Sequence, residues 1–161
     1  MTEPVEVTLV VNGAARQVSV PPRYSLADAL RERAGLVGTH VGCEQGVCGS
    51  CTVLVDEMPA RSCLVLAVSA DGSRVRTVEG LADGEGLDEL QEQFRRHHGL
   101  QCGFCTPGFL MSITHLLELP ERPTPEQVEE MLEGVACRCT GYVNIKAAAL
   151  AAVEARFGNA S

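Results

Sequence analysis

The sequence contains no tryptophan, and aromatic residues make up only 4% of its 161 residues. Aromatic platforms on which bases or sugars stack are therefore scarce. Basic residues are also in the minority, since the chain has 13 Lys and Arg and 21 Asp and Glu, for a formal net charge of -8. Because nucleic acids and anionic membranes bind basic surfaces, neither is expected as the main partner.

Long apolar runs are absent as well. None approaches the roughly 20 residues that a membrane-spanning helix needs, so no membrane span is predicted. The first residues, Met1 to Glu6, lack the basic and apolar segments of a secretory signal, and a cytoplasmic location is expected. In that reducing compartment the eight cysteines are poor candidates for disulfides and are better explained as metal ligands or redox residues.

The chain is nevertheless rich enough in apolar residues to fold. It is 45% hydrophobic and 21% charged, which excludes disorder over most of its length. Alternating apolar residues predict a hairpin that turns at Asn12-Gly13, and Ser25 is expected to cap a helix that ends near Ala34. Further strands are predicted over residues 52–55, 63–68 and 74–78.

From residue 86 the pattern becomes helical. Thr106-Pro107 and Thr124-Pro125 are expected helix starts, and other helices are predicted over residues 87–98 and 145–157. An acidic, glycine-rich segment over residues 79–86 separates the two patterns. The predicted fold class is therefore α+β, with one domain over residues 1–80 and an all-helical domain over residues 86–161.

The first four cysteines have the spacing of a plant-type [2Fe–2S] site. They follow the pattern C-x4-C-x2-C, then eleven residues, then a fourth cysteine: Cys43, Cys48, Cys51 and Cys63. Three neighbouring glycines permit the positive φ angles and close approach that a loop wrapped around a cluster needs: Gly42, Gly46 and Gly49. A four-cysteine zinc site and unrelated thiols remain alternatives, although structural zinc sites favour two compact pairs.

The second four cysteines form C-x2-C and C-x-C pairs separated by 31 residues: Cys102, Cys105, Cys137 and Cys139. Four thiolates suit an iron–sulfur cluster or zinc almost equally. Each pair precedes a predicted helix, and helix N-termini favour an anionic group, so a second cluster is the preferred interpretation.

Three motifs together resemble the small iron–sulfur subunit of the molybdenum hydroxylases, the family of xanthine dehydrogenase, aldehyde oxidoreductase and carbon monoxide dehydrogenase. They are GCEQGVCGSCT over residues 42–52, QCGFCTPG over residues 101–108 and CRCTGY over residues 137–142. The resemblance extends from about Val5 to Phe157. It implies an N-terminal β-grasp ferredoxin-like domain followed by an all-α four-helix domain, each with one [2Fe–2S] cluster.

The same resemblance implies partners and a role. A large subunit would hold molybdopterin-bound molybdenum and a medium subunit would hold FAD, in a dimer of heterotrimers. Gln101 and Cys139 are expected near the pterin, and electrons would pass from molybdenum through the two clusters to FAD. Val135-Ala136 replaces the Asn–Leu pair usual before C-R-C, which could alter local packing.

The chain has no G-x-G-x-x-G motif and no P-loop, and no nucleophile–base pair is apparent. We therefore expect part of a molybdenum-dependent oxidoreductase that performs no substrate chemistry on this chain. A free-standing two-cluster ferredoxin and a zinc-stabilised interaction module are the alternatives. An apolar surface around Gln101 and residues 137–142 would favour the subunit, and acidic groups there would favour the free carrier.

Overall fold

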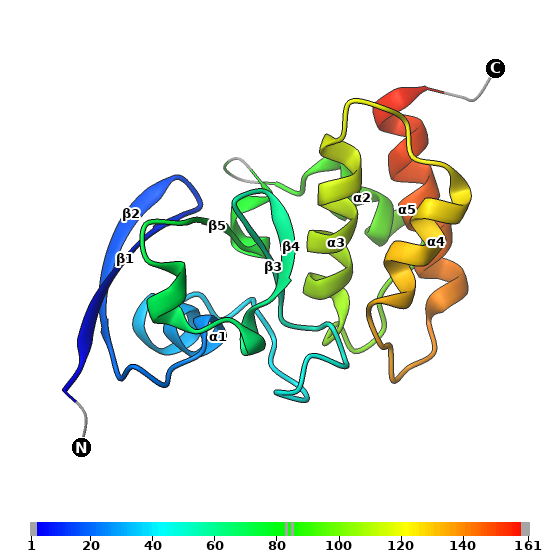
Figure 1. Ribbon diagram of the computed structural model, residues 1–161. Coiled ribbons are helices and arrows are strands. Elements are labelled where there is room, and N and C mark those ends of the chain that lie inside the picture. The colour runs from blue at the N-terminus through cyan, green and yellow to red at the C-terminus, as the bar shows by residue number, and fades with distance from the viewer. Residues whose placement is uncertain (1–2, 83, 85, 159–161) are drawn as a thin grey trace.

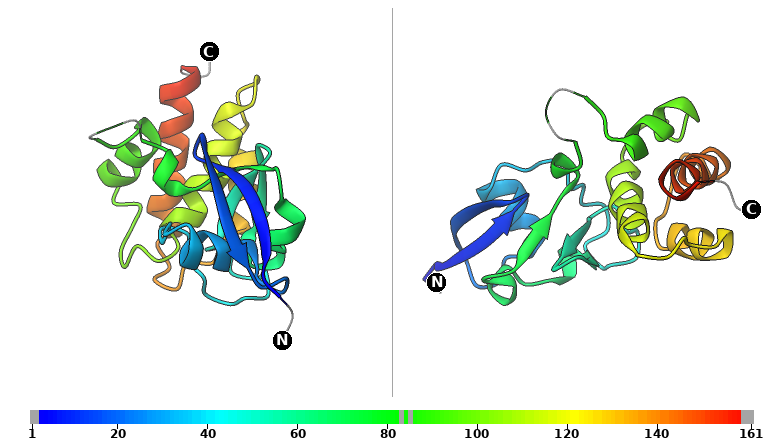
Figure 2. Two further views of the ribbon diagram at one scale, coloured as in Figure 1. Left: turned by 90° about the vertical axis from the view of Figure 1, so that its left-hand side faces the viewer. Right: turned by 90° about the horizontal axis from the view of Figure 1, so that it is seen from above.

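The computed structural model describes residues 3–82, 84 and 86–158. A sheet forms one side of the molecule and four helices gather on the other, with α3 (Thr106–Glu118) next to the sheet (Figure 1). Figure 2 shows the same two layers from other directions. None of the helices among the described residues is long and apolar enough to cross a lipid bilayer.

The sheet has five strands in the order β2-β1-β5-β3-β4. β1 and β5 are parallel, and the other neighbours are antiparallel. The strands are β1 (Val5–Val11), β2 (Ala14–Val20), β3 (Thr52–Val55), β4 (Met58–Arg61) and β5 (Arg74–Arg76). The predicted hairpin is confirmed, since Asn12 and Gly13 have φ angles of 50° and 80° at its turn. Alternate β1 residues are buried in the core beneath the sheet.

The strand predicted over residues 63–68 is wrong. Ser62–Leu64 and Ala67–Ala70 form 3-10 turns instead, and the strand lies earlier, at β4. β4 is a short edge strand that contains Pro59, a residue tolerated at an edge because no neighbour needs its missing N–H. The apolar residues taken for a strand are partly surface residues, since Leu64 and Leu66 are exposed.

Three of the five α-helices begin with a side-chain capping box. α1 (Leu26–Asp28) starts at Ser25 with the predicted capping box and continues as a π-helical turn over Ala29–Arg33. Thr124 likewise caps α4 (Pro125–Glu133). The other helices are α2 (Glu89–Arg96), α3 and α5 (Tyr142–Phe157). The predicted cap at Thr106 is wrong: the N-cap of α3 is Cys105, and the hydroxyl of Thr106 is buried without a partner.

The predicted fold class needs correction. The chain is α+β, with a five-stranded mixed sheet and five α-helices, but a sheet domain followed by an all-α four-helix domain does not describe it. Helix α3 packs against β3 and β4 as well as against the other helices. Residues 107–114 of α3 are all buried, so this helix is a shared middle layer. The sequence of α3 indicates this burial, because its apolar residues lie on every face of the helix.

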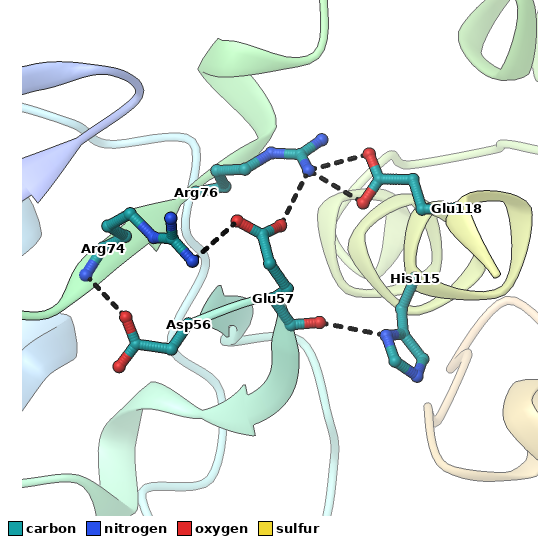
Figure 3. Close-up of polar contacts among 6 residues, drawn as sticks. All are labelled: Asp56, Glu57, Arg74, Arg76, His115 and Glu118. Carbon is teal, nitrogen blue, oxygen red and sulfur yellow. Dashed lines mark hydrogen bonds and ion pairs between the residues drawn. The ribbon is translucent and has the colours of Figure 1, made fainter.

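A polar network also joins the β3–β4 turn to α3 (Figure 3). Its members are Asp56, Glu57, Arg74, Arg76, His115 and Glu118. Burial disfavours the charge of Arg76, but its hydrogen bonds with Glu118 and Glu57 outweigh that effect and raise its pKa. His115 Nδ1 lies 3.0 Å from the carbonyl oxygen of Glu57. Because exposed ion pairs stabilise by only about 0–1 kcal/mol each, the network mainly orients the turn against the helix.

Close backbone packing at Gly108 yields a first prediction. A Cβ there would overlap the carbonyl oxygen of Gly49, which belongs to the first cysteine loop. Alanine is favoured over glycine inside a helix by about 1 kcal/mol, but overpacking against fixed backbone costs about 1–3 kcal/mol. We therefore expect Gly108→Ala to lower the free energy of unfolding by up to about 2 kcal/mol in urea titrations. Gly86→Ala is the control, because a Cβ there meets nothing within 4 Å; equal effects of the two changes would contradict the packing argument.

Candidate metal centres

The first group of cysteines occupies the loop before β3 and the turn after β4. Cys43, Cys48 and Cys51 lie in the loop, and Cys63 lies in the turn Ser62–Leu64. Two backbone N–H groups point at the sulfur of Cys43, from Cys48 at 3.4 Å and from Gln45 at 3.5 Å. These N–H groups lower the pKa of Cys43 to about 6. Amide donors directed at a sulfur favour the thiolate that binds metal.

The four sulfurs of this group lie in two pairs. The side chain of Cys48 helps to lower the pKa of Cys43, and the side chain of Cys51 helps to raise the pKa of Cys63. Burial raises the pKa of Cys63 to about 11, and the nearby thiol of Cys51 adds to the effect. Cys43 therefore ionises easily, whereas the Cys51 and Cys63 pair needs a cation nearby to offset the charges of two thiolates.

Glycine is required in this loop, as predicted. Gly46 and Gly49 have φ angles of 76° and 72°, and a Cβ on Gly46 would overlap the side chain of Leu64. Gly42 is needed because its neighbours lie close: an added Cβ would be 3.2 Å from the ring of Phe104 and 3.3 Å from the sulfur of Cys48. The loop can thus keep its backbone close to its own thiols.

The second group lies between helices. Cys102 and Cys105 precede α3, and Cys137 and Cys139 lie between α4 and α5. The sulfurs again form neighbouring pairs, Cys102 with Cys139 and Cys105 with Cys137. Burial raises the pKa of Cys105 to about 12, whereas the N–H of Phe104 lowers the pKa of Cys102. These pairs join segments more than 30 residues apart in the sequence.

The helix starts contribute to this group, as the sequence predicted. The backbone N–H of Gly141, the N-cap of α5, points at the sulfur of Cys137 at 3.4 Å. Cys105 itself is the N-cap of α3. Both helices therefore direct their N-terminal ends toward the thiols, where the helix dipole favours negative charge.

The paired arrangement suits a two-iron cluster. Within the part of the chain that the structure describes, no three or more His, Cys, Asp or Glu side chains surround one point as a single metal ion requires. The pKa effects instead link the thiols of each group mainly two by two, Cys43 with Cys48 and Cys51 with Cys63, and Cys102 with Cys139 and Cys105 with Cys137. In a [2Fe–2S] cluster four thiolates are divided between two irons, whereas tetrahedral zinc needs all four around one ion. The donor set therefore fits a [2Fe–2S] cluster at each group.

The two groups lie against each other. The backbone N–H of Ala136 donates to the carbonyl oxygen of Cys48 at 2.9 Å. Beside this contact a cavity of about 420 Å³ is lined by residues of both groups, including Cys43 and Cys137. The ring of Phe104 stacks on His40 with centroids 5.0 Å apart, so the second group also covers part of the first loop.

The residues predicted near the pterin lie together. The side-chain amide of Gln101 donates to the carbonyl oxygen of Cys139 at 3.2 Å, and Gln101 is exposed. Sequence reasoning missed Tyr142, whose hydroxyl accepts the N–H of Cys137 at 2.8 Å, and it missed Arg61. Tyr142 lies within the CRCTGY motif and could have been found there. Arg61 has no local signal, because its partner Gly134 is 73 residues away.

Comparisons with known proteins agree with this geometry. Residues 9–74 match the model of the 2Fe-2S iron-sulfur cluster binding domain, and residues 77–150 match that of the [2Fe-2S] binding domain. The nicotine 6-hydroxylase small subunit of Paenarthrobacter nicotinovorans is 56% identical over 146 residues, which are 91% of this chain and 88% of that protein. The chain belongs to the family of small iron–sulfur subunits of the molybdenum hydroxylases.

Solved structures extend the family likeness to the whole fold. Quinoline 2-oxidoreductase from Pseudomonas putida 86 is similar with a TM-score of 0.87 and 50% identity, over 96% of this chain and 99% of that chain. The aldehyde oxidoreductase from Desulfovibrio desulfuricans ATCC 27774 also gives a TM-score of 0.87, at 38% identity. This chain covers 17% of that longer chain. The iron–sulfur fold thus occurs both as a nearly complete chain and as one part of a larger one.

Proposed function

We propose that this chain is the electron-transfer subunit of a molybdenum hydroxylase complex. The observation that carries the proposal is that two complete groups of four paired thiols lie on one small chain and touch through its backbone. A [2Fe–2S] cluster at each group supplies one-electron oxidation and reduction when bound. The chain's part is to hold both groups at a fixed separation.

The thiol pairs suggest how each cluster is held. We infer that Cys43 and Cys48 bind one iron of the first cluster and that Cys51 and Cys63 bind the other. In the second cluster, Cys102 and Cys139 would share one iron and Cys105 and Cys137 the other. The neighbouring sulfurs within each pair support this division.

Exposed apolar side chains around both groups support a subunit rather than a free-standing ferredoxin. Val47, 77% exposed, and Leu64, 62% exposed, flank the first group. Around the second group the exposed apolar side chains are those of Leu100, Phe104, Tyr142 and Val143, the last 82% exposed. Apolar residues gathered at electron-transfer sites are typical of a surface that a partner covers.

The partners and the direction of transfer follow from the family. We propose that the second group docks onto a molybdopterin-binding large subunit and the first onto an FAD-binding medium subunit, in a dimer of heterotrimers. Electrons would enter at the second group and leave from the first. The fusion of this fold into a longer aldehyde oxidoreductase chain supports permanent association. Free thiols also need a reducing compartment, and we propose the cytoplasm.

Purification of the native complex tests this function. A tagged copy of the chain, expressed in its own host, should retain two larger subunits at high salt, and the complex should contain molybdenum, FAD and iron. Recovery of the tagged chain alone, with both clusters intact and no molybdenum or flavin, would favour the free-standing ferredoxin instead.

Gln101 supplies a second prediction. We propose that it lies at the pterin with Cys139, because its amide can donate and accept hydrogen bonds at once. Gln101→Leu removes the bond to the carbonyl oxygen of Cys139 and leaves that acceptor unpaired in a covered surface, which costs about 1–3 kcal/mol. We expect both clusters to remain, reduction by substrate in the assembled complex to slow, and reduction by dithionite to be unchanged.

The control for this change is Gln17→Leu, an equivalent substitution on the exposed part of β2. It should alter neither assembly nor electron transfer. If Gln101→Leu behaves like Gln17→Leu in stopped-flow measurements of substrate-driven reduction, Gln101 is only a local structural residue.

A further inference from the structure

The junction between the two cysteine groups is made of backbone with almost no side-chain space. The carbonyl oxygen of Cys48 accepts the N–H of Ala136 at 2.9 Å. A Cβ on Gly49 would overlap the carbonyl oxygen of Gly134, and one on Gly108 would overlap that of Gly49. The first loop, the end of α4 and the start of α3 therefore meet in direct backbone contact.

The side chain of Arg61, at the end of β4, reaches into this junction. Its Nη1 donates to Thr52 Oγ1 at 2.5 Å, and its Nη2 donates to the carbonyl oxygen of Gly134 at 2.5 Å. The Thr52 hydroxyl in turn donates to the carbonyl oxygen of Gly49 at 2.6 Å. The guanidinium thus bridges the residue that follows Cys51 and the segment that leads to Cys137.

The charge of Arg61 is not balanced by a carboxylate. Its partners are a hydroxyl group and a peptide carbonyl, and none of the ion pairs found among the described residues includes it. Arg76, which joins the sheet to α3, has both Glu57 and Glu118 as ion-pair partners. Arg61 is half-buried, and its guanidinium carries a positive charge. A half-buried cation without a carboxylate partner is available to stabilise another anionic group nearby.

Cysteines of both groups adjoin the two ends of this bridge in the sequence, since Cys51 precedes Thr52 and Cys137 follows Gly134 by three residues. We propose that Arg61 is a positioning residue for electron transfer, whose positive charge makes both clusters easier to reduce while its two hydrogen bonds hold the junction closed. The proposal rests on the function proposed above. When an external donor delivers one electron, one ferric ion becomes ferrous and the site gains one negative charge. A fixed cation nearby favours that charged state, and the net charge around a cluster is among the factors that set its potential.

The test removes the charge and keeps a hydrogen-bond donor. In the purified complex, reduction potentials of both clusters are measured by dithionite titration with redox mediators, followed by electron paramagnetic resonance. Arg61→Gln should lower both potentials, with a change of about tenfold in each one-electron equilibrium constant, or about 59 mV. Arg61→Lys keeps the charge and should remain close to the unmodified protein.

A second pair of variants neutralises Arg61 without removing it. Gly134 has a φ of -68°, which any residue can adopt, and a Cβ there would lie 2.9 Å from the movable Nη2 of Arg61. Gly134→Asp would bring a carboxylate to the guanidinium and should lower both potentials. Gly134→Ala adds the Cβ alone, which shifts Nη2 but keeps the charge of Arg61, and should lower the potentials much less than Gly134→Asp does. This pair decides the question if Arg61→Gln does not fold.

Arg74→Gln is the control for net charge, because Arg74 lies on the exposed surface in the network of Figure 3. Salt screens such exposed charges, so its effect should be small. Potentials of Arg61→Gln equal to those of the unmodified protein would overturn the proposal, and so would an Arg61→Lys protein as hard to reduce as Arg61→Gln. Absence of [2Fe–2S] signals from the electron paramagnetic resonance spectrum of the unmodified protein would instead contradict the proposed function.

Discussion

Replacement of Cys48 by serine is expected to abolish one of two distinct paramagnetic signals and to leave the other intact. Each group has four thiols of its own, and no thiol of one group pairs with a thiol of the other. Cys137→Ser should therefore have the reverse effect. The measurement is electron paramagnetic resonance of the dithionite-reduced protein, with iron content expected to fall by about half in each variant.

The two substitutions are controls for each other, because they lie on either side of the same junction. Serine keeps the backbone bond between Cys48 and Ala136, so the contact between the groups should persist. Loss of both signals from either single change, in protein still folded by circular dichroism, would contradict the assignment of two sites. The boundary predicted between residues 80 and 86 stays a prediction, and independent loss of the clusters would favour it.

Removal of both clusters is expected to destabilise the fold strongly. The loop over residues 34–51 contains no regular helix or strand, and Cys51, Cys105 and Cys137 are buried. Without metal, these thiols no longer hold the loop or the ends of α3 and α5 together. Cluster binding also adds negative charge to a chain whose formal net charge is already -8, so binding must outweigh that repulsion.

The chain length sets how far Tm falls for a given loss of stability. A loss of about 5 kcal/mol lowers the Tm of a chain of this size by roughly 10–20 °C. Differential scanning calorimetry of holo and cluster-free protein measures the difference, and reconstitution with iron and sulfide should restore the original Tm. Identical melting of the two forms would mean that the clusters do not stabilise this fold.

Local signals in the sequence predicted much of the site. Cysteine spacing predicted both thiol groups as cluster ligands, which stays a prediction, and glycine at 46 and 49 marked positions that have positive φ angles in the structure. Asn12-Gly13 predicted the hairpin turn, and Thr124 predicted the start of α4. Each of these features depends on residues close together in the chain, where intrinsic preferences decide the conformation.

Features that depend on distant contacts were missed. The sequence shows the end of a strand at Arg61, but not that its guanidinium reaches Gly134. Thr106 has the sequence of a helix cap, yet the fold gives that position to Cys105. The separate all-helical domain was wrong for the same reason, because α3 is covered by strands that precede it by about 50 residues. Tertiary packing overrides local preference at each of these positions.

Iron and acid-labile sulfide analysis of the anaerobically purified protein, together with its absorption spectrum, tests the central claim most directly. Two paired groups of four thiols predict about four irons and four sulfides per chain, with the visible absorption of [2Fe–2S] clusters. Zinc in place of iron, with no visible absorption, would contradict the account.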